Sequence, residues 1–222
     1  MLVQQLFPDK IICLEADPDL LKGELLPEES KIVEGAINWR VREFRAGRIL
    51  VREALLQKGI HKFPLINDDN RVPVWPKGII GSITHTKNYC AVAIGSSKEF
   101  RGIGVDAEII SRVKPELWDK ICTPIELTAL NQCDAETAKV NSALIFSAKE
   151  SFYKCQYALT KTFIGFHDVE IAINLNDEIF TVTLKKDVGR YLRMGQQFAG
   201  NFLIRDNLLV TGLLIRSQSV NR

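Results

Sequence analysis

The order of the predicted elements constrains the fold of this chain more than any other feature of its sequence. A long helical segment is predicted from Ser30, a capping residue shortly after Pro27, to about Lys58, where Gly59 is a natural stop. Strands follow it, and a second long helix over residues 139–159 is again followed by strands. Helix then strands, twice, predicts the α+β class, with two similar halves related by a pseudo-twofold, each a long helix packed on a small antiparallel sheet.

Turn residues and alternating patterns divide the rest of the chain into short elements. Residues 79–85 and 89–94 predict a hairpin, and residues 102–106, which read GIGVD, predict a third strand. Thr123 begins a helix, because Pro and Glu follow it at the positions of a capping box. Residues 111–119 are predicted to form a flexible loop. Four further strands are predicted over residues 168–175, 179–185, 197–204 and 208–215.

The charge balance and the cysteines argue against several classes of protein. Lys and Arg number 29 against 27 Asp and Glu, and a formal charge of +2 indicates neither a nucleic acid nor a membrane surface as partner. The five cysteines form no C-x-x-C pair and indicate neither a zinc site nor a disulfide framework. No apolar run approaches the roughly 18 residues that span a bilayer. We therefore expect a cytoplasmic protein with reduced thiols.

An arginine interrupts the apolar seam of the first helix. The seam has the spacing of one buried helix face, and its members are Ile37, Val41, Phe44, Arg48, Val51 and Leu55. Burying an unpaired guanidinium costs several kcal/mol. Arg48 must therefore reach a carboxylate, a carbonyl cluster or a bound anion, unless it extends sideways to water. The surrounding segment is basic, which suits either a polyanionic small molecule or a solvated helix face.

Two acids mark the end of the GIGVD strand. Asp106 and Glu108 lie two residues apart, so both carboxylates project from the same face of the strand. Two like charges at this separation repel each other unless a cation offsets them. An all-oxygen pair with open positions suits Mg²⁺ that carries water and substrate phosphates. The alternative is a pair of solvated carboxylates at a strand end.

The second helix contains the segment FSAKESFYK, in which Phe146, Glu150 and Lys154 fall four residues apart on one face. Glu150 and Lys154 form either an ordinary helical ion pair or part of a phosphoryl-transfer site, with Glu150 as a third magnesium ligand and Lys154 on phosphate oxygens. His85 ends the hydroxyl-rich strand GSITHT. It is either a plain structural histidine or part of a phosphate cradle.

Taken in order, GSITHT, GIGVDAE and FSAKESFYK resemble the 4′-phosphopantetheinyl transferases of the two-halved type, which activate surfactin and enterobactin synthetases. The similarity extends to WPKGIIGS, AGRILVREAL and LTKTFIGFHD, and it spans residues 40–170. The resemblance implies transfer of the 4′-phosphopantetheine group from coenzyme A to a serine of an apo acyl or peptidyl carrier protein. It also implies Mg²⁺ as cofactor and 3′,5′-ADP as the leaving product.

The resemblance assigns catalytic roles by motif. Magnesium and the pyrophosphate of coenzyme A would be bound by Asp106, Glu108 and Glu150, with Lys154 and His85 on the phosphates. The serine would attack the β-phosphorus in line, with Glu150 as the base, directly or through a water. Lys154 would stabilise the phosphate oxygens and protonate the leaving group.

The remaining contacts to coenzyme A are also implied by the resemblance. Thr84 lies beside the family histidine, and Arg48 and Arg40 would bind the 3′-phosphate, which agrees with an arginine in an apolar seam. The adenine-contacting loop falls near Asn70 and Arg71. Here this chain reads NDDNRVP, whereas many relatives carry Gly and Lys.

The two halves, 1–105 and 106–222, are expected to divide this work, with phosphate contacts in the first and the acids and catalytic helix in the second. The carrier protein is expected to dock on Arg112, Lys114 and Trp118. Since both halves are present in one chain, we expect a monomer. Two alternatives stay open: a Mg²⁺-dependent phosphohydrolase acting on coenzyme A or a related nucleotide, and a non-catalytic coenzyme A sensor.

Overall fold

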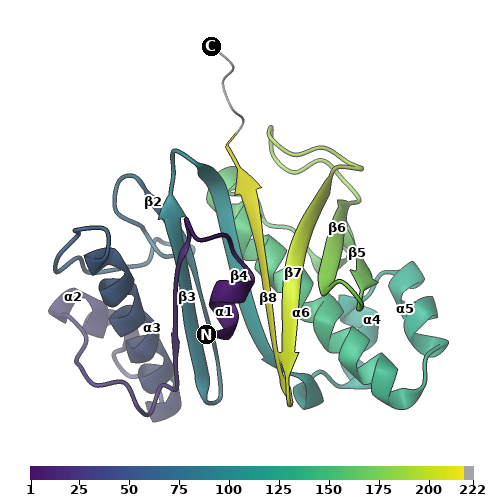
Figure 1. The fold of residues 1–222 in the computed structure, drawn as a ribbon, viewed down its shortest axis with the longest axis horizontal. Coiled ribbons are helices and arrows are strands. Elements are labelled where there is room, and N and C mark those ends of the chain that lie inside the picture. The colour runs from purple at the N-terminus through teal and green to yellow at the C-terminus, as the bar shows by residue number, and fades with distance from the viewer. Residues whose placement is uncertain (218–222) are drawn as a thin grey trace.

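The computed structural model describes residues 1–217 and contains two antiparallel sheets, each covered by one long helix (Figure 1). The N-terminal sheet has the strand order β1-β3-β2, and the C-terminal sheet has the order β4-β8-β7-β6-β5. The predicted α+β class is confirmed. The pseudo-twofold and the division at residue 105 stay predictions; β4 crosses that position, and residues 218–222 of the predicted second half lie outside the described residues.

The predicted hairpin, the GIGVD strand and the four late strands all form, with small differences at their ends. The strands are β1 (Ile12–Ala16), β2 (Ile79–Thr86), β3 (Tyr89–Ser96), β4 (Phe100–Ile109), β5 (Val169–Asn174), β6 (Ile179–Leu184), β7 (Gln197–Arg205) and β8 (Leu208–Arg216). The helices are α1 (Leu2–Gln5), α2 (Pro27–Ser30), α3 (Asn38–Leu56), α4 (Trp118–Ile121), α5 (Pro124–Asn131) and α6 (Ala135–Thr160). Among the described residues, no helix has the length and apolar composition to cross a membrane.

The prediction of one continuous first helix from Ser30 is wrong. Ser30 ends α2, a 3₁₀ turn (Lys31–Val33) follows, and Gly35 then has a φ of +74°, a conformation that is open to glycine at little cost and that ends helical geometry. Helix α3 therefore begins at Asn38, and Ile37 of the predicted seam precedes it and is exposed. The predicted stop is confirmed, because Gly59 also has a φ of +74° just beyond the last turn.

The second long helix begins earlier than predicted, and the predicted flexible loop after β4 is structured. Asp134 caps α6 by accepting hydrogen bonds from the N–H groups of Glu136 and Thr137, so the helix starts at Ala135. The loop prediction for residues 111–119 is wrong, since 3₁₀ turns at Ile110–Arg112 and Pro115–Leu117 lead into α4. Pro115 at the first helical position favours the second turn.

The two sheets meet where β2 and β4 run side by side (Figure 1). No backbone ladder joins these two strands among the described residues; side-chain hydroxyls do so instead. Ser82 Oγ accepts the N–H of Val105 at 3.1 Å, and Thr84 Oγ1 accepts the N–H of Ala107 at 3.0 Å. The hydroxyl-rich sequence of β2 therefore fixes the position of β4 beside it.

Candidate active site

The carboxylate of Asp106 is the meeting point of three elements. Lys154 of α6 lies with its Nζ 2.6 Å from Asp106 Oδ1, and Thr84 of β2 donates to the same oxygen at 3.3 Å. Ser147, also on α6, donates to Asp106 Oδ2 at 2.8 Å. Asp106 is buried, so these donors stabilise a charge that would be costly in isolation.

Lys154 does not form the ordinary helical ion pair with Glu150, because its ammonium instead reaches β4, where it also donates to the Val105 carbonyl at 3.2 Å. Glu150 lies one turn earlier on α6 and is half-buried. The helix thus directs its lysine at the strand and leaves the Glu150 carboxylate without a hydrogen bond among residues 1–217. This arrangement favours the functional interpretation of the FSAKESFYK segment over the purely structural one.

The acids Asp106, Glu108 and Glu150 influence one another electrostatically. Burial, and then the negative charge of Asp106, raise the pKa of the Glu108 carboxyl to about 7. Burial also raises the pKa of Glu150, with the charge of Asp106 acting in the same direction. Within the described residues, no three His, Cys, Asp or Glu side chains meet as a preformed metal site. The donor chemistry, three carboxylates, fits a hard divalent cation such as Mg²⁺.

His85 lies on the N-terminal side of this cluster, at the end of β2. Its Nδ1 is 3.1 Å from Glu43 Oε2 of α3. Partial burial lowers the pKa of the His85 imidazole, while the charge of Glu43 raises it. Both residues line two cavities, one on each side of the pair. His85 and Glu43 therefore separate the two cavities.

The first cavity, of about 810 Å³, lies between α3 and the segment after Leu65, and Arg40, Arg48 and Arg71 line it. Arg48 is only 4% exposed, so it does not extend to water. Its Nε donates to the Leu65 carbonyl at 2.8 Å and its Nη2 to Asn67 Oδ1 at 2.7 Å. Burial lowers the pKa of the guanidinium to about 10. Carbonyl and amide oxygens are thus the partners that the seam arginine required.

Asn70 and Arg71 belong to a tight loop organised by one carboxylate. Asp68 Oδ1 accepts the N–H groups of Asn70 and Val72, at 3.0 and 2.9 Å. Arg71 adopts a φ of +63°, a left-handed conformation that costs energy for a side chain of this size. Arg71 lines the arginine cavity, and both Asn70 and Arg71 line a neighbouring cavity of about 450 Å³ that also contains Lys154.

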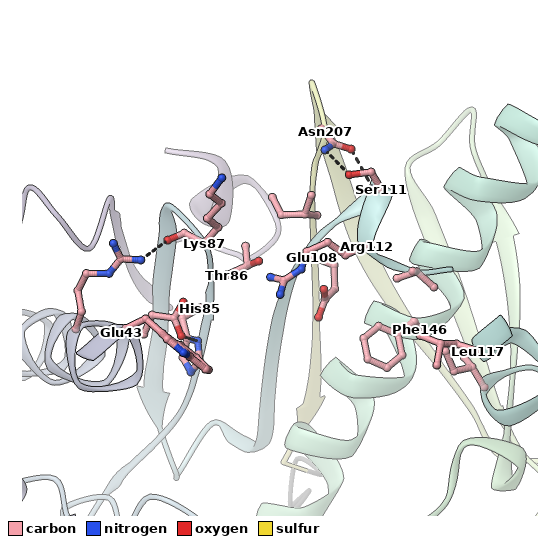
Figure 2. A pocket seen from close by; sticks show the side chains of 15 residues that line it. Glu43, His85, Thr86, Lys87, Glu108, Ser111, Arg112, Leu117, Phe146 and Asn207 are labelled. Atoms are coloured by element: carbon pink, nitrogen blue, oxygen red, sulfur yellow. Dashed lines mark hydrogen bonds and ion pairs between the residues drawn. The ribbon is translucent and has the colours of Figure 1, made fainter. Parts of the chain in front are cut away.

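The second cavity beside His85 has a volume of about 990 Å³ (Figure 2). Figure 2 shows Glu43, His85 and Thr86 on one side and Glu108, Arg112 and Phe146 on the other. Exposed Trp39 and Leu117 contribute apolar surface to the lining. Lys114 is exposed, but Trp118 is half-buried against the C-terminal core, so its neighbour Leu117 presents the apolar surface.

Two buried polar atoms in this cavity wall have no hydrogen-bond partner. Four such side-chain atoms occur among the described residues, and two of them, Thr86 Oγ1 and Arg42 Nε, belong to residues lining this one cavity. Buried polar groups are normally satisfied, so an unpaired pair at one place requires an explanation. Both atoms are themselves buried, so a ligand in the cavity does not reach them in this conformation.

Sequence reasoning missed Ser147, Thr211, Glu43 and Glu29. Ser147 Oγ lies 2.9 Å from Thr211 Oγ1, and Thr211 donates to the Ser147 carbonyl, so β8 supports the serine that holds Asp106. Ser147 lies in the quoted segment FSAKESFYK, and its fixed distance before Glu150 was the available signal. The other contacts join segments that are remote in sequence.

Comparisons with known proteins match both parts of the chain to one family. A family model described as the 4′-phosphopantetheinyl transferase N-terminal domain matches residues 28–95, and one described as the 4′-phosphopantetheinyl transferase superfamily matches residues 102–205. The chain is 29% identical to 4′-phosphopantetheinyl transferase Npt of Nocardia iowensis, over 88% of this chain and 90% of that protein. It is 31% identical to PptT of Mycobacterium tuberculosis, over 79% and 75%. It is 33% identical to enterobactin synthase component D of Escherichia coli, over 78% and 76%.

Proposed function

The chain belongs to the 4′-phosphopantetheinyl transferase superfamily, and on this premise we propose how it transfers the 4′-phosphopantetheine group of coenzyme A to a serine of an apo carrier protein. One observation carries the proposal. Thr84 of the N-terminal half and Lys154 of the C-terminal half hold the same Asp106 oxygen, and His85, one residue after Thr84, lines two large cavities. A phosphoryl group bound there would be reached from both sides.

Coenzyme A would enter from the side of the arginine cavity. Arg48 and Arg40 are proposed to bind its 3′-phosphate, with Asn70 and Arg71 beside the adenine. Nη1 of Arg48 makes no hydrogen bond within residues 1–217, so it is free to donate to a phosphate oxygen. His85 and Thr84 would then lie next to the pyrophosphate.

Mg²⁺ is proposed to bind to Asp106, Glu108 and Glu150, where it would supply positive charge to the phosphate oxygens. Lys154 would add a second positive charge from α6. The serine oxygen forms a bond to the β-phosphorus as the bond to the oxygen bridging the α-phosphorus breaks, and 3′,5′-ADP leaves. Glu150 accepts the serine proton, directly or through a water, and Lys154 donates a proton to the leaving oxygen.

The carrier protein is proposed to approach through the 990 Å³ cavity. Arg112 and Lys87 would meet acidic side chains there, Leu117 and Trp39 an apolar surface, with Lys114 nearby. A cytoplasmic monomer is part of the proposal. All five cysteines are free thiols, which suits a reducing compartment.

Mass spectrometry of an apo carrier protein incubated with this protein, coenzyme A and Mg²⁺ tests the proposal. We expect the carrier to gain the mass of phosphopantetheine, and EDTA or Glu150→Gln to abolish the gain. Loss of coenzyme A without modification of the carrier would indicate a phosphohydrolase instead. If the wild type and Glu150→Gln bind coenzyme A equally well and neither of them turns it over, the protein is a sensor.

A further inference from the structure

Glu29 is a fully buried acid, with an exposed fraction of 0%, and it is not one of the three acids proposed to bind Mg²⁺. Its Oε2 accepts Arg52 Nη1 at 2.6 Å and the Leu26 N–H at 2.9 Å, and its Oε1 accepts the Leu65 N–H at 3.0 Å. A buried carboxylate with three donors, one of them charged, is a rigid anchor rather than a tolerated surface acid. It joins α2, α3 and the segment that begins at Leu65.

The backbone of Leu65 connects this anchor to the arginine cavity. Glu29 holds the Leu65 N–H, and the carbonyl of the same residue receives Nε of Arg48 at 2.8 Å. Asn67, two residues later, receives Nη2 of the same guanidinium. The position of the Leu65 segment therefore determines the orientation of Arg48, because two of its three nitrogens bind that segment.

Arg48 and Arg52 differ in whether a carboxylate neutralises their charge. Arg52, one turn after Arg48 on α3, forms a direct ion pair with Glu29 at 2.6 Å. Arg48 forms no ion pair among the described residues, and its partners are neutral oxygens. Its charge is therefore not neutralised at contact distance, and it lines the cavity with Nη1 unengaged. Arg48 is preorganised for an anion, and Glu29 supports it without competing for its charge.

We propose that Glu29 is a positioning residue that sets Arg48 against the 3′-phosphate, and thereby gives the protein its preference for coenzyme A over dephospho-coenzyme A. This inference rests on the proposed function, since it requires Arg48 to contact that phosphate. A side chain that orients the binding group, without touching the ligand, changes the KM for coenzyme A, which carries the 3′-phosphate, and hardly changes kcat.

Steady-state kinetics of Glu29→Gln with coenzyme A and with dephospho-coenzyme A tests the inference. We expect KM for coenzyme A to rise about tenfold, the scale of one hydrogen bond to a charged group, with kcat and the KM for dephospho-coenzyme A nearly unchanged. Glu28→Gln is the matched control, because Glu28 is the exposed neighbour on the same helix. An unchanged preference in Glu29→Gln would overturn the inference.

Two further variants separate positioning from loss of structure. Arg52→Gln breaks the same ion pair but leaves the Glu29–Leu65 bond, so it should lower the thermal unfolding midpoint and keep the substrate preference. In an Arg48→Met background, Glu29→Gln should have no additional effect on KM for coenzyme A. An additional rise there contradicts the role. If Glu29→Gln does not fold, Glu29→Asp, which is too short to reach both Leu65 and Arg52, takes its place.

Failure of the underlying function gives a different result. If the wild type transfers equally well from both substrates, then the proposed contact between Arg48 and the 3′-phosphate is wrong. If the wild type modifies no carrier protein, then the proposed function is wrong. Only a wild-type preference that persists in the Glu29 variants counts against Glu29 alone.

Discussion

The ammonium nitrogen of Lys154 lies 2.6 Å from Asp106 Oδ1, so α6 is tied directly to β4. The same lysine donates to the Val105 carbonyl, which leaves its long side chain stretched across the helix–strand boundary. An ammonium held in this way can serve a phosphate without first being ordered, which reduces the entropic cost of catalysis.

Replacing Lys154 by methionine should therefore abolish most of the transfer activity. The variant keeps the length of the side chain but removes the charge, and loss of one preorganised charge typically lowers kcat about 100- to 1,000-fold. Lys139→Met, a half-exposed position on the same helix, is the control. Near-normal turnover of Lys154→Met with saturating carrier protein would contradict the catalytic role.

Ser147→Ala tests the support of Asp106 from its other oxygen. The serine donates to Asp106 Oδ2 at 2.8 Å, and a hydrogen bond to a charged group is worth about 1.5–3 kcal/mol. We expect kcat to fall by about tenfold or more. Ser142→Ala is a matched control, because that buried serine bonds only to the Lys139 carbonyl within α6. Equal kcat values for the two variants would show that Asp106 needs no such support.

Thr86→Val should separate stability from partner binding. Thr86 is 5% exposed and its hydroxyl has no partner within residues 1–217, so removing the hydroxyl should leave the free energy of unfolding unchanged or raise it by about 1 kcal/mol. The KM values for the carrier protein and for coenzyme A should both stay constant, because this hydroxyl is buried and a docking partner does not reach it. Urea unfolding and steady-state kinetics measure the two effects, and Thr86→Ser should behave like the wild type. A raised KM for the carrier protein would contradict this expectation and show that docking exposes the hydroxyl.

The buried pair of Lys149 and Glu126 makes a prediction about stability alone. Lys149 Nζ lies 2.6 Å from Glu126 Oε2 and also donates to the carbonyls of Ile121 and Phe166. Lys149→Met leaves Glu126 buried without its cation, which should lower the free energy of unfolding by about 3–5 kcal/mol. Adding Glu126→Gln should recover part of the loss, because it removes the unpaired charge and keeps an oxygen that can accept the Ile171 N–H.

Urea denaturation measures both Lys149 variants, with Lys139→Met at a half-exposed position as control. A surface ion pair contributes at most about 1 kcal/mol, so the control should unfold close to the wild type. A loss of less than 1 kcal/mol in Lys149→Met would mean that the pair contributes no more than its desolvation costs.

The sequence predicted those features that depend on neighbours in the chain. Alternation along a strand sufficed to put Asp106 and Glu108 on one face, and helical spacing sufficed to identify Arg48 as an anomaly. Its actual partners, Leu65 and Asn67, lie 17 and 19 residues later in a segment without periodicity, so no pattern could identify them.

Contacts between distant segments were beyond the reach of the sequence for the same reason. Spacing alone would pair Lys154 with Glu150, four residues away, whereas tertiary packing gives it to Asp106, 48 residues away. The first helix was predicted too long because the positive φ of Gly35, which interrupts the segment from Ser30, leaves no mark in the apolar spacing from which the helix was predicted.

The hydroxyl bonds between β2 and β4 have a consequence for any attempt to divide the protein. Thr84 and Asp106 belong to different sheets, yet the Thr84 hydroxyl donates to the Asp106 carboxylate and accepts the N–H of Ala107. Separately expressed fragments would each leave part of this constellation exposed to water. Activity after mixing them would therefore report that the contact between β2 and β4 has formed again. Fragment complementation would thus be a direct assay of how the two sheets recognise each other.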